Sequence, residues 1–356
     1  MMNASRFTGW KDAQFSRREF LQRAGKTALC AALLPLNLPI APHKSSQAEE
    51  KDPKLGRVTA GSIVGRSQPG FDGEKLTQYA RDSLLTITAA VLGDEDTGQN
   101  RIWYWVNQES YVHSGNIQPV AENPQTPLLQ IDGDPILAEV CMPFTDAVWN
   151  IRYPSRSAYR FYYGSTVWLQ AVLTAPDGSA WYRIRDDMWG YTYFIRGEHL
   201  RIVQPADVAP LSPQVPLELK RVDVHLPEQM VIAYEDGTPV FMARCATGAK
   251  FSGGDYRTPA GIYVTNRKRP SRHMAASSYD LPGIPWVSYI LDNGISFHGT
   301  YWHNQYGQPR SHGCINLTPQ DALWIYRWTS PAVPLEKATI EEKTGTMVNI
   351  IEKETE

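Results

Sequence analysis

The stretch RSHGCINLTPQDALWIYRW (Arg310–Trp328) puts a cysteine on a loop directly before a helix. Thr318 is a good N-cap residue, Pro319 suits the first helical position, and Asp321 occupies the position of a reciprocal capping acid. The predicted helix therefore begins just behind Cys314. Taken alone, this cysteine is open to four interpretations: a buried structural thiol, a metal ligand, half of a disulfide or a nucleophile.

Apolar runs joined by turn residues predict strands upstream of this loop. Asp236-Gly237 separates two such runs and predicts a hairpin. Asn293-Gly294 repeats the pattern, and the strand that follows it ends at His298. The sequence thus predicts an imidazole near the cysteine loop.

These residue types favour nucleophilic chemistry. A cysteine nucleophile needs a populated thiolate, which a neighbouring imidazole or a helix N-terminus can supply. His298 is the candidate base for Cys314. Gly299 and Gly313 allow close approach of the backbone, as an oxyanion pocket requires. We expect the N–H groups of Gly313 and Cys314 to face the oxyanion of a tetrahedral intermediate.

The first 48 residues differ in charge from the rest of the chain. They hold seven basic and two acidic residues, which leaves 28 basic and 35 acidic residues, or about −7, for the remainder. A body this acidic is a poor nucleic-acid binder. Arg17-Arg18, followed by the apolar run 27–40, resembles a twin-arginine export signal. Small residues ending at Ala48 suit cleavage, and the apolar run is too short for a stable membrane span.

Loss of such a signal leaves an odd number of cysteines. Cys30 leaves with the signal, and Cys141, Cys245 and Cys314 cannot all pair with one another. One free thiol is therefore expected, although a disulfide between Cys314 and one of the other two stays open.

A zinc site is the remaining alternative for the cysteine. His298, His303, His312 and Cys314 are residue types that bind zinc, but only the last two have a short spacing. We expect no metal and no cofactor.

Two blocks, 56–122 and 129–204, are rich in aromatic and β-branched runs broken by turn residues. In each block a W-Y-x-[VI] strand precedes a polar turn, an aromatic strand and a final apolar strand, which indicates a duplication. The proline-rich segment 205–217 is expected to be a semi-rigid linker to a domain over 218–352.

The two blocks resemble bacterial SH3-like barrels. The resemblance rests on Trp103–Val106 with Tyr111–Val112, and on Trp181–Ile184 with Gly190-Tyr191. Members of that family often hold cell-wall peptides, so the blocks are expected to act either as wall binders or as spacers.

The C-terminal domain resembles the L,D-transpeptidases of the YkuD type. The match consists of His298-Gly299-Thr300, a spacer of twelve residues, and Ser311-His312-Gly313-Cys314-Ile315-Asn316. Upstream, Arg257–Gly261 resembles the TPxG turn of that family. The resemblance implies a mainly β chain in which two small SH3-like barrels precede a YkuD-type β-sandwich, with a short helix after the nucleophile loop.

The resemblance also implies a reaction. Cys314 would attack the carbonyl that precedes the terminal D-alanine of a peptidoglycan stem peptide, with His298 as general base and later general acid. An amine of a second stem peptide would resolve the thioester into a 3→3 cross-link. The residues leave other acceptors open: water would make an L,D-carboxypeptidase, and a protein amine would attach that protein to the wall. A silent catalytic domain would leave a wall-binding scaffold.

Neighbouring motif residues have expected supporting roles. The Gly299 carbonyl would orient the imidazole, and His312 would shape the oxyanion pocket with Gly313 or bind substrate. Ser311 would brace the loop and so shape the site. Asn316 would brace the loop or bind substrate.

Arg310 is expected to meet a stem-peptide carboxylate or to form a surface ion pair. A second basic segment, NRKRPSRH (Asn266–His273), is expected to form a loop that attracts such carboxylates or is simply solvated. The expected partners are donor and acceptor stem peptides and the twin-arginine translocase. The expected location is the periplasm or the extracellular cell wall.

Overall fold

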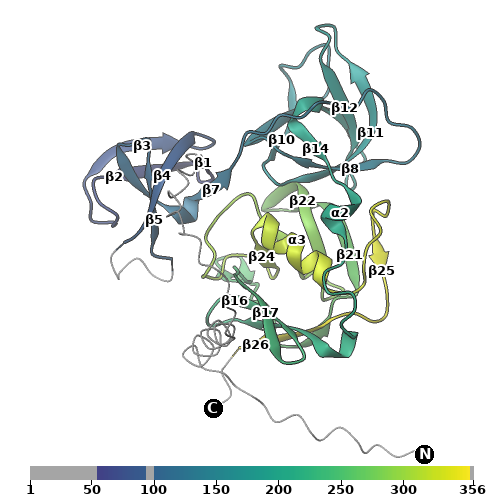
Figure 1. Cartoon of the computed structure of the whole chain (residues 1–356). Helices are drawn as coiled ribbons and strands as arrows, with labels where there is room; N and C mark the ends of the chain where they lie inside the picture. The colour runs from purple at the N-terminus through teal and green to yellow at the C-terminus, as the bar shows by residue number, and fades with distance from the viewer. Residues whose placement is uncertain (1–53, 94–99, 353–356) are drawn as a thin grey trace, which may run out of the picture. The chain divides into compact units, whose positions relative to one another are not determined.

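The computed structural model of this protein describes residues 54–93 and 100–352 (Figure 1). The predicted export signal over 1–48 lies outside the described residues. The described chain is mainly β, as the sequence predicts. None of its described helices is long and apolar enough to cross a membrane.

The first seven strands form one antiparallel sheet in the order β3-β2-β6-β5-β4-β1-β7. Alternate side chains of these strands point inward and build a separate hydrophobic core. The elements are β1 (Lys54–Val58), β2 (Ser62–Arg66), β3 (Lys75–Ala80), β4 (Leu84–Leu92), β5 (Ile102–Val106), β6 (Ser110–His113), η2 (Ser114–Asn116) and β7 (Ile117–Val120).

The next seven strands repeat that topology in the order β10-β9-β13-β12-β11-β8-β14. Each position holds the strand whose number is seven higher, which is the arrangement that a duplication produces. Buried side chains of these strands form a second, separate hydrophobic core. The elements are β8 (Ile136–Val140), β9 (Phe144–Val148), β10 (Ser157–Tyr162), β11 (Thr166–Thr174), β12 (Ala180–Arg185), β13 (Thr192–Arg196), η3 (Gly197–His199) and β14 (Leu200–Ile202).

The proline-rich segment over 205–217 is packed rather than extended in solvent. Its first residues form the short helix α2 (Pro205–Val208). Val208 and Leu211 join the hydrophobic core of the C-terminal strands, and Leu211 N donates to Arg327 O at 3.1 Å. The segment therefore differs from the expected spacer, because its apolar residues have a core to contact.

The C-terminal part contains two five-stranded sheets, β17-β16-β15-β26-β20 and β24-β23-β22-β21-β25. Apolar residues of both sheets meet in one core, as in the expected sandwich. Helix α3 (Pro319–Trp328) packs against β22, β23 and β24 (Figure 1). The remaining bounds are η4 (Leu217–Leu219), β15 (Lys220–His225), β16 (Met230–Glu235), β17 (Thr238–Arg244), β18 (Lys250–Phe251), β19 (Gly254–Asp255), β20 (Gly261–Val264), β21 (Arg267–Ala276), β22 (Tyr279–Tyr289), β23 (Ser296–Gly299), β24 (Ile315–Leu317), β25 (Ile340–Glu341) and β26 (Met347–Ile351).

The predicted turn and helix start are confirmed. Asp236 and Gly237 have φ values of 46° and 74°, the left-handed geometry of a two-residue hairpin turn between β16 and β17. Thr318 caps α3, because its Oγ1 accepts from Asp321 N at 3.1 Å. The predicted reciprocal cap differs: the Asp321 carboxylate accepts from the Thr318 hydroxyl at 2.7 Å.

The basic segment Asn266–His273 forms most of strand β21, so the predicted loop is wrong. Lys268 is completely buried, and its Nζ donates to Tyr326 O at 2.7 Å and to Thr329 O at 2.5 Å. These carbonyls end α3, where the helix leaves acceptors unpaired and favours a cation. The lysine that composition assigns to solvent therefore binds the C-terminal carbonyls of a helix.

Candidate active site

Two adjacent parallel strands bring the predicted catalytic residues together. In the register of β23 and β24, Phe297 pairs with Ile315 and His298 pairs with Asn316. Phe297 and Ile315 are fully buried in the core. Because side chains alternate along a strand, His298 and Cys314 point to the opposite face of this strand pair.

The Cys314 thiol is partly exposed and lies among polar groups. Its Sγ is 3.7 Å from Ser296 Oγ and 3.8 Å from Gly294 O. Burial alone would raise the pKa of Cys314, but the hydrogen bond and charge of His298, together with Ser296, outweigh burial and lower it. The site therefore favours the thiolate.

The orientation of His298 fits the role of a base. Its Nδ1 lies 3.0 Å from Gly299 O, and since a carbonyl only accepts, Nδ1 carries a proton. This leaves Nε2 available to exchange a proton with Cys314. A Cβ at Gly299 would lie 2.6 Å from Pro285 Cγ, so only glycine fits beside the imidazole.

Ser311 makes two hydrogen bonds within the loop Arg310–Cys314, which is called the nucleophile loop after its predicted role. Its Oγ donates to Cys314 O at 2.5 Å and accepts from Gly313 N at 3.1 Å. Gly313 has a φ of 114°, which side-chain-bearing residues rarely adopt. One expectation needs correction: the Gly313 N–H binds Ser311 here, so of the two expected oxyanion donors one is engaged within the loop.

Thr258 also supports this loop, a role that its sequence position did not reveal. Its hydroxyl donates to Gly313 O at 2.8 Å and accepts from Gly248 N at 2.8 Å. The TPxG-like turn is therefore tied directly to the nucleophile loop. The TPxG-like motif marked this residue, and threonine tends to bind backbone groups, but neither signal named Gly313 as its partner.

His312 lies in an aromatic cluster on the exposed side of the loop. Its ring centroid is 4.8 Å from that of Phe251, 4.5 Å from that of Tyr256 and 5.6 Å from that of Tyr279. Phe251 and Tyr256 are themselves partly exposed. His312 can therefore contact substrate on this side, while the hydrogen bond to Cys314 comes from His298.

Arg310 and Asn316 have protein partners. The exposed Arg310 guanidinium donates to the Gln305 side chain. The Asn316 side-chain amide faces His303 Nε2 at 3.0 Å. Burial lowers the pKa of His303 to about 3, so this ring is neutral and structural.

The segment between His298 and Cys314 forms hydrogen bonds with residues of the first strand-rich block. Asn304 N donates to Gly115 O at 3.0 Å, and Gln305 Nε2 donates to Asn116 Oδ1 at 3.0 Å. Arg57 of β1, which is 1% exposed, donates to Tyr301 O at 2.5 Å. The first sheet thus contributes to the shape of the segment between His298 and Cys314, which we call the candidate catalytic loop.

The other thiols have different surroundings. Cys141, Cys245 and Cys314 are all free, so the disulfide that the sequence left open between Cys314 and one of the other two is not formed. Burial raises the pKa of Cys141 to about 11 and raises that of Cys245 further. Among residues 54–93 and 100–352, no three His, Cys, Asp or Glu side chains form a group that could hold a metal ion.

Comparisons with known proteins agree with the resemblance at the C-terminal domain. Residues 219–350 match the YkuD family model, the L,D-transpeptidase catalytic domain. L,D-transpeptidase 2 of Mycobacterium tuberculosis is 25% identical over 116 residues, and the match spans 28% of this chain and 28% of that protein. A Mycobacterium smegmatis L,D-transpeptidase structure is 20% identical, with a TM-score of 0.31 over 37% of this chain and 58% of that chain. An L,D-transpeptidase structure from Xylanimonas cellulosilytica is 26% identical, with a TM-score of 0.28 over 37% of this chain and 60% of that chain.

Proposed function

We propose that this protein is an exported peptidoglycan L,D-transpeptidase that forms 3→3 cross-links through a thioester on Cys314. The observation that carries the proposal is the lowered pKa of Cys314 beside His298, whose Nδ1 is fixed by the Gly299 carbonyl. A thiol paired with an oriented imidazole is the arrangement that nucleophilic catalysis requires.

In the first step the Cys314 thiolate attacks the carbonyl carbon that precedes the terminal D-alanine of a donor stem peptide. The C–N bond breaks, and the imidazolium of His298 gives its Nε2 proton to the departing D-alanine amine. The Cys314 N–H stabilises the oxyanion of the tetrahedral intermediate. The acyl group stays on Sγ as a thioester.

In the second step an amine of an acceptor stem peptide attacks the thioester. His298 takes the proton from that amine, the C–S bond breaks, and the thiolate and a new amide result. The peptide bond broken in the first step supplies the acyl group, so the exchange consumes no ATP. Arg310 and Asn316, with His312, would bind the stem peptides around the thiol.

Mass spectrometry of the full-length protein with disaccharide-tetrapeptide tests this proposal. We expect an acyl-enzyme on Cys314 and a cross-linked dimer product. Cys314→Ala should abolish both, while Cys141→Ala, which removes a buried thiol elsewhere, should retain both. Dimer formation by the Cys314→Ala variant would defeat the mechanism.

The same experiment separates the alternative acceptors. A tripeptide product without dimer would indicate an L,D-carboxypeptidase. Stem peptide joined to an added protein amine would indicate wall attachment. Absence of any acyl-enzyme would leave the wall-binding scaffold.

The proposal includes the domain organisation: a twin-arginine signal over 1–48, SH3-like domains over 56–122 and 129–204, a linker over 205–217 and the catalytic domain over 218–352. The two sheets of equal strand order support the pair of N-terminal domains. Deleting Arg17 and Arg18 should retain the protein in the cytosol, and co-sedimentation of the Cys314→Ala protein with purified wall should reveal wall binding.

A further inference from the structure

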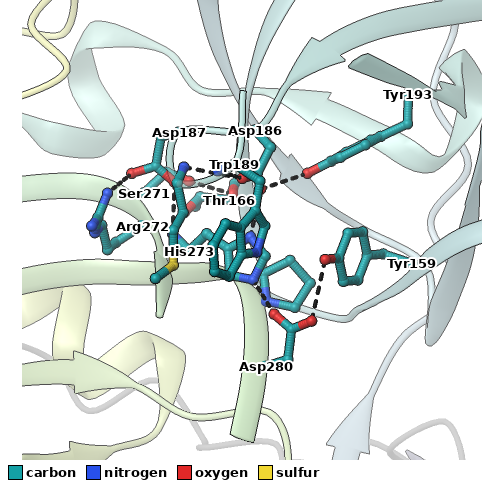
Figure 2. A network of polar contacts seen from close by, with 12 residues as sticks. Tyr159, Thr166, Asp186, Asp187, Trp189, Tyr193, Ser271, Arg272, His273 and Asp280 are labelled. Carbon is teal, nitrogen blue, oxygen red and sulfur yellow. Dashed lines mark hydrogen bonds and ion pairs between the residues drawn. The ribbon is translucent and has the colours of Figure 1, made fainter. Parts of the chain in front are cut away.

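A histidine in strand β21 lies between carboxylates that come from two sheets (Figure 2). His273 Nδ1 is 2.5 Å from Asp186 Oδ2, and His273 Nε2 contacts Asp280 Oδ1. Because carboxylates accept, both ring nitrogens donate, and the ring, 1% exposed, is an imidazolium. Burial alone would lower the pKa of His273, but the hydrogen bonds and charges of both carboxylates outweigh burial and raise it.

Asp186, which follows β12 in the second sheet, is a fixed anchor. Its Oδ1 accepts from Met188 N at 3.0 Å and from Trp189 N at 2.6 Å, and its Oδ2 also accepts from Tyr193 OH at 3.1 Å. Burial opposes the charge of Asp186, yet these donors and His273 lower its pKa. The turn that holds Asp186 therefore sets the position of the imidazolium.

Further hydrogen bonds hold the same part of β21 to the second sheet. Asp187 accepts from His273 N at 2.8 Å and from Arg272 Nη1 at 2.5 Å. Ser271 Oγ donates to Thr166 O at 2.6 Å. Three consecutive residues of β21 are therefore in fixed register with the second sheet (Figure 2).

Asp280 links the hydrogen bonds around His273 to a residue near the nucleophile loop. It follows Tyr279 at the start of β22, and its Oδ2 accepts from Tyr159 OH at 3.2 Å. The Tyr279 ring lies 5.6 Å from the His312 ring. Burial and then the negative charge of Cys314 raise the pKa of Tyr279, so this ring is within electrostatic reach of the thiolate.

We propose that Asp186 and His273 are positioning residues for the acyl transfer, and that through Asp280 they hold Tyr279 against the nucleophile loop. The second sheet is then a working part of the active site rather than only a spacer or a wall binder. This inference rests on the proposed function, but part of its test does not.

The clamp formed by Asp186, His273 and Asp280 depends on pH. The other titratable groups that face His273 are Tyr159 and Tyr193, while Asp187 and Arg272 form an ion pair beside it. A group whose pKa is raised in the folded state contributes while it is protonated. Positioning therefore holds at lower pH and weakens as pH rises through the raised pKa of His273.

A double-mutant cycle in the full-length protein tests the connection. Asp186→Asn should lower the single-turnover acylation rate by roughly tenfold, with little change in KM, in the wild-type background. In the Tyr279→Ala background the same substitution should change the rate by less than about twofold. Asp146→Asn, a half-exposed carboxylate of the second sheet that pairs with Arg160, is the matched control and should leave the rate unchanged. Equal effects of Asp186→Asn in both backgrounds would overturn the proposal.

Alkylation of Cys314 by iodoacetamide provides a readout that needs no acyl transfer. Asp186→Asn and Tyr279→Ala should each change the alkylation rate by about threefold or more, without additivity, and His273→Gln should remove the inflection that deprotonation of His273 produces in the pH profile. Identical alkylation in all variants would overturn the positioning role. If the effects of the two substitutions on alkylation are not additive but the wild type shows no acylation, only the proposed function is defeated.

If Asp186→Asn does not fold, Tyr159→Phe, which removes only the hydroxyl bound to Asp280, takes its place in the cycle.

Discussion

At the scale of single residues, the pKa of each cysteine thiol depends on the groups that surround it. Cys141 and Cys245 lie in surroundings that raise their pKa values, because burial disfavours their thiolates. Cys314 is also subject to desolvation, but the imidazole of His298 and the hydroxyl of Ser296 reverse its effect. The position of one histidine on the adjacent strand thus decides which of the three described thiols has a lowered pKa.

His298→Gln should therefore raise the pKa of Cys314. The glutamine keeps a polar side chain but supplies neither the charge nor the basicity of imidazole, so burial then dominates. Iodoacetamide alkylation at neutral pH should become about tenfold slower, with its midpoint at higher pH. His225→Gln, at the end of β15 outside the site, is the control, and an equal loss in both variants would contradict the assignment.

Sequence reasoning predicted that His298 pairs with Cys314, because the motif contains both residue types at a recognisable spacing. It did not identify Thr258, whose bond to Gly313 joins positions 55 residues apart. The contact between Asp186 and His273 spans 87 residues. Residue types are visible in a sequence, whereas such distant partners depend on the packing of whole sheets.

At the scale of elements, local signals predicted the hairpin turns and the start of α3, because turns and caps depend on a few neighbouring residues. The same approach failed for β21. Its four basic residues and Pro270 suggested an exposed loop, since prolines and charges are uncommon in strands. Arg267 lies over the ring of Tyr289, and Lys268 binds a carbonyl of α3. These tertiary contacts outweigh the local preference of such residues for a loop.

The burial of Lys268 predicts how stability depends on pH. Its pKa is well below the usual lysine range in the folded state, first because of burial and then because of the nearby charge of Lys220. Between that lowered pKa and the unfolded value of about 10.5 the unfolded chain binds more protons, so the free energy of unfolding rises with pH. In urea titrations across the alkaline range, wild type should gain stability relative to Lys268→Met. Exposed Lys75→Met should follow wild type, and a parallel pH profile of wild type and Lys268→Met would contradict this prediction.

At the scale of the whole molecule, the strand-rich parts have separate cores but are joined by side-chain contacts. Arg57 illustrates this connection. It forms an ion pair with Asp82 at 2.8 Å, hydrogen bonds with Gln118, and lies 3.9 Å from the centre of the Tyr162 ring in the second sheet. Arg57 also donates to the Tyr301 carbonyl, so this one side chain contacts both sheets and the candidate catalytic loop. The sequence predicted the separate sheets from their strand patterns, but contained no signal for this junction.

Arg57→Leu should reduce both stability and acyl transfer. The substitution leaves the Tyr301 carbonyl without this donor and leaves Asp82 with Arg160, at 2.9 Å, as its remaining cation. Loss of hydrogen bonds to a charged group costs about 1.5–3 kcal/mol. Denaturant unfolding and the acylation rate measure the two effects. Arg66→Leu in the same sheet, where the guanidinium binds only the Gly73 carbonyl, should change each far less. Full activity of Arg57→Leu would show that the candidate catalytic loop holds its shape without the first sheet.

The contrast between one partly exposed thiol and two buried ones has a practical consequence. Protein from which the predicted signal has been removed, and Cys30 with it, retains Cys314 as its accessible sulfhydryl, since Cys141 and Cys245 are 6% and 0% exposed. A stoichiometric chromogenic disulfide reagent should then release one equivalent of dye per native molecule and three after denaturation. That ratio would count competent active sites in any preparation before a substrate is known.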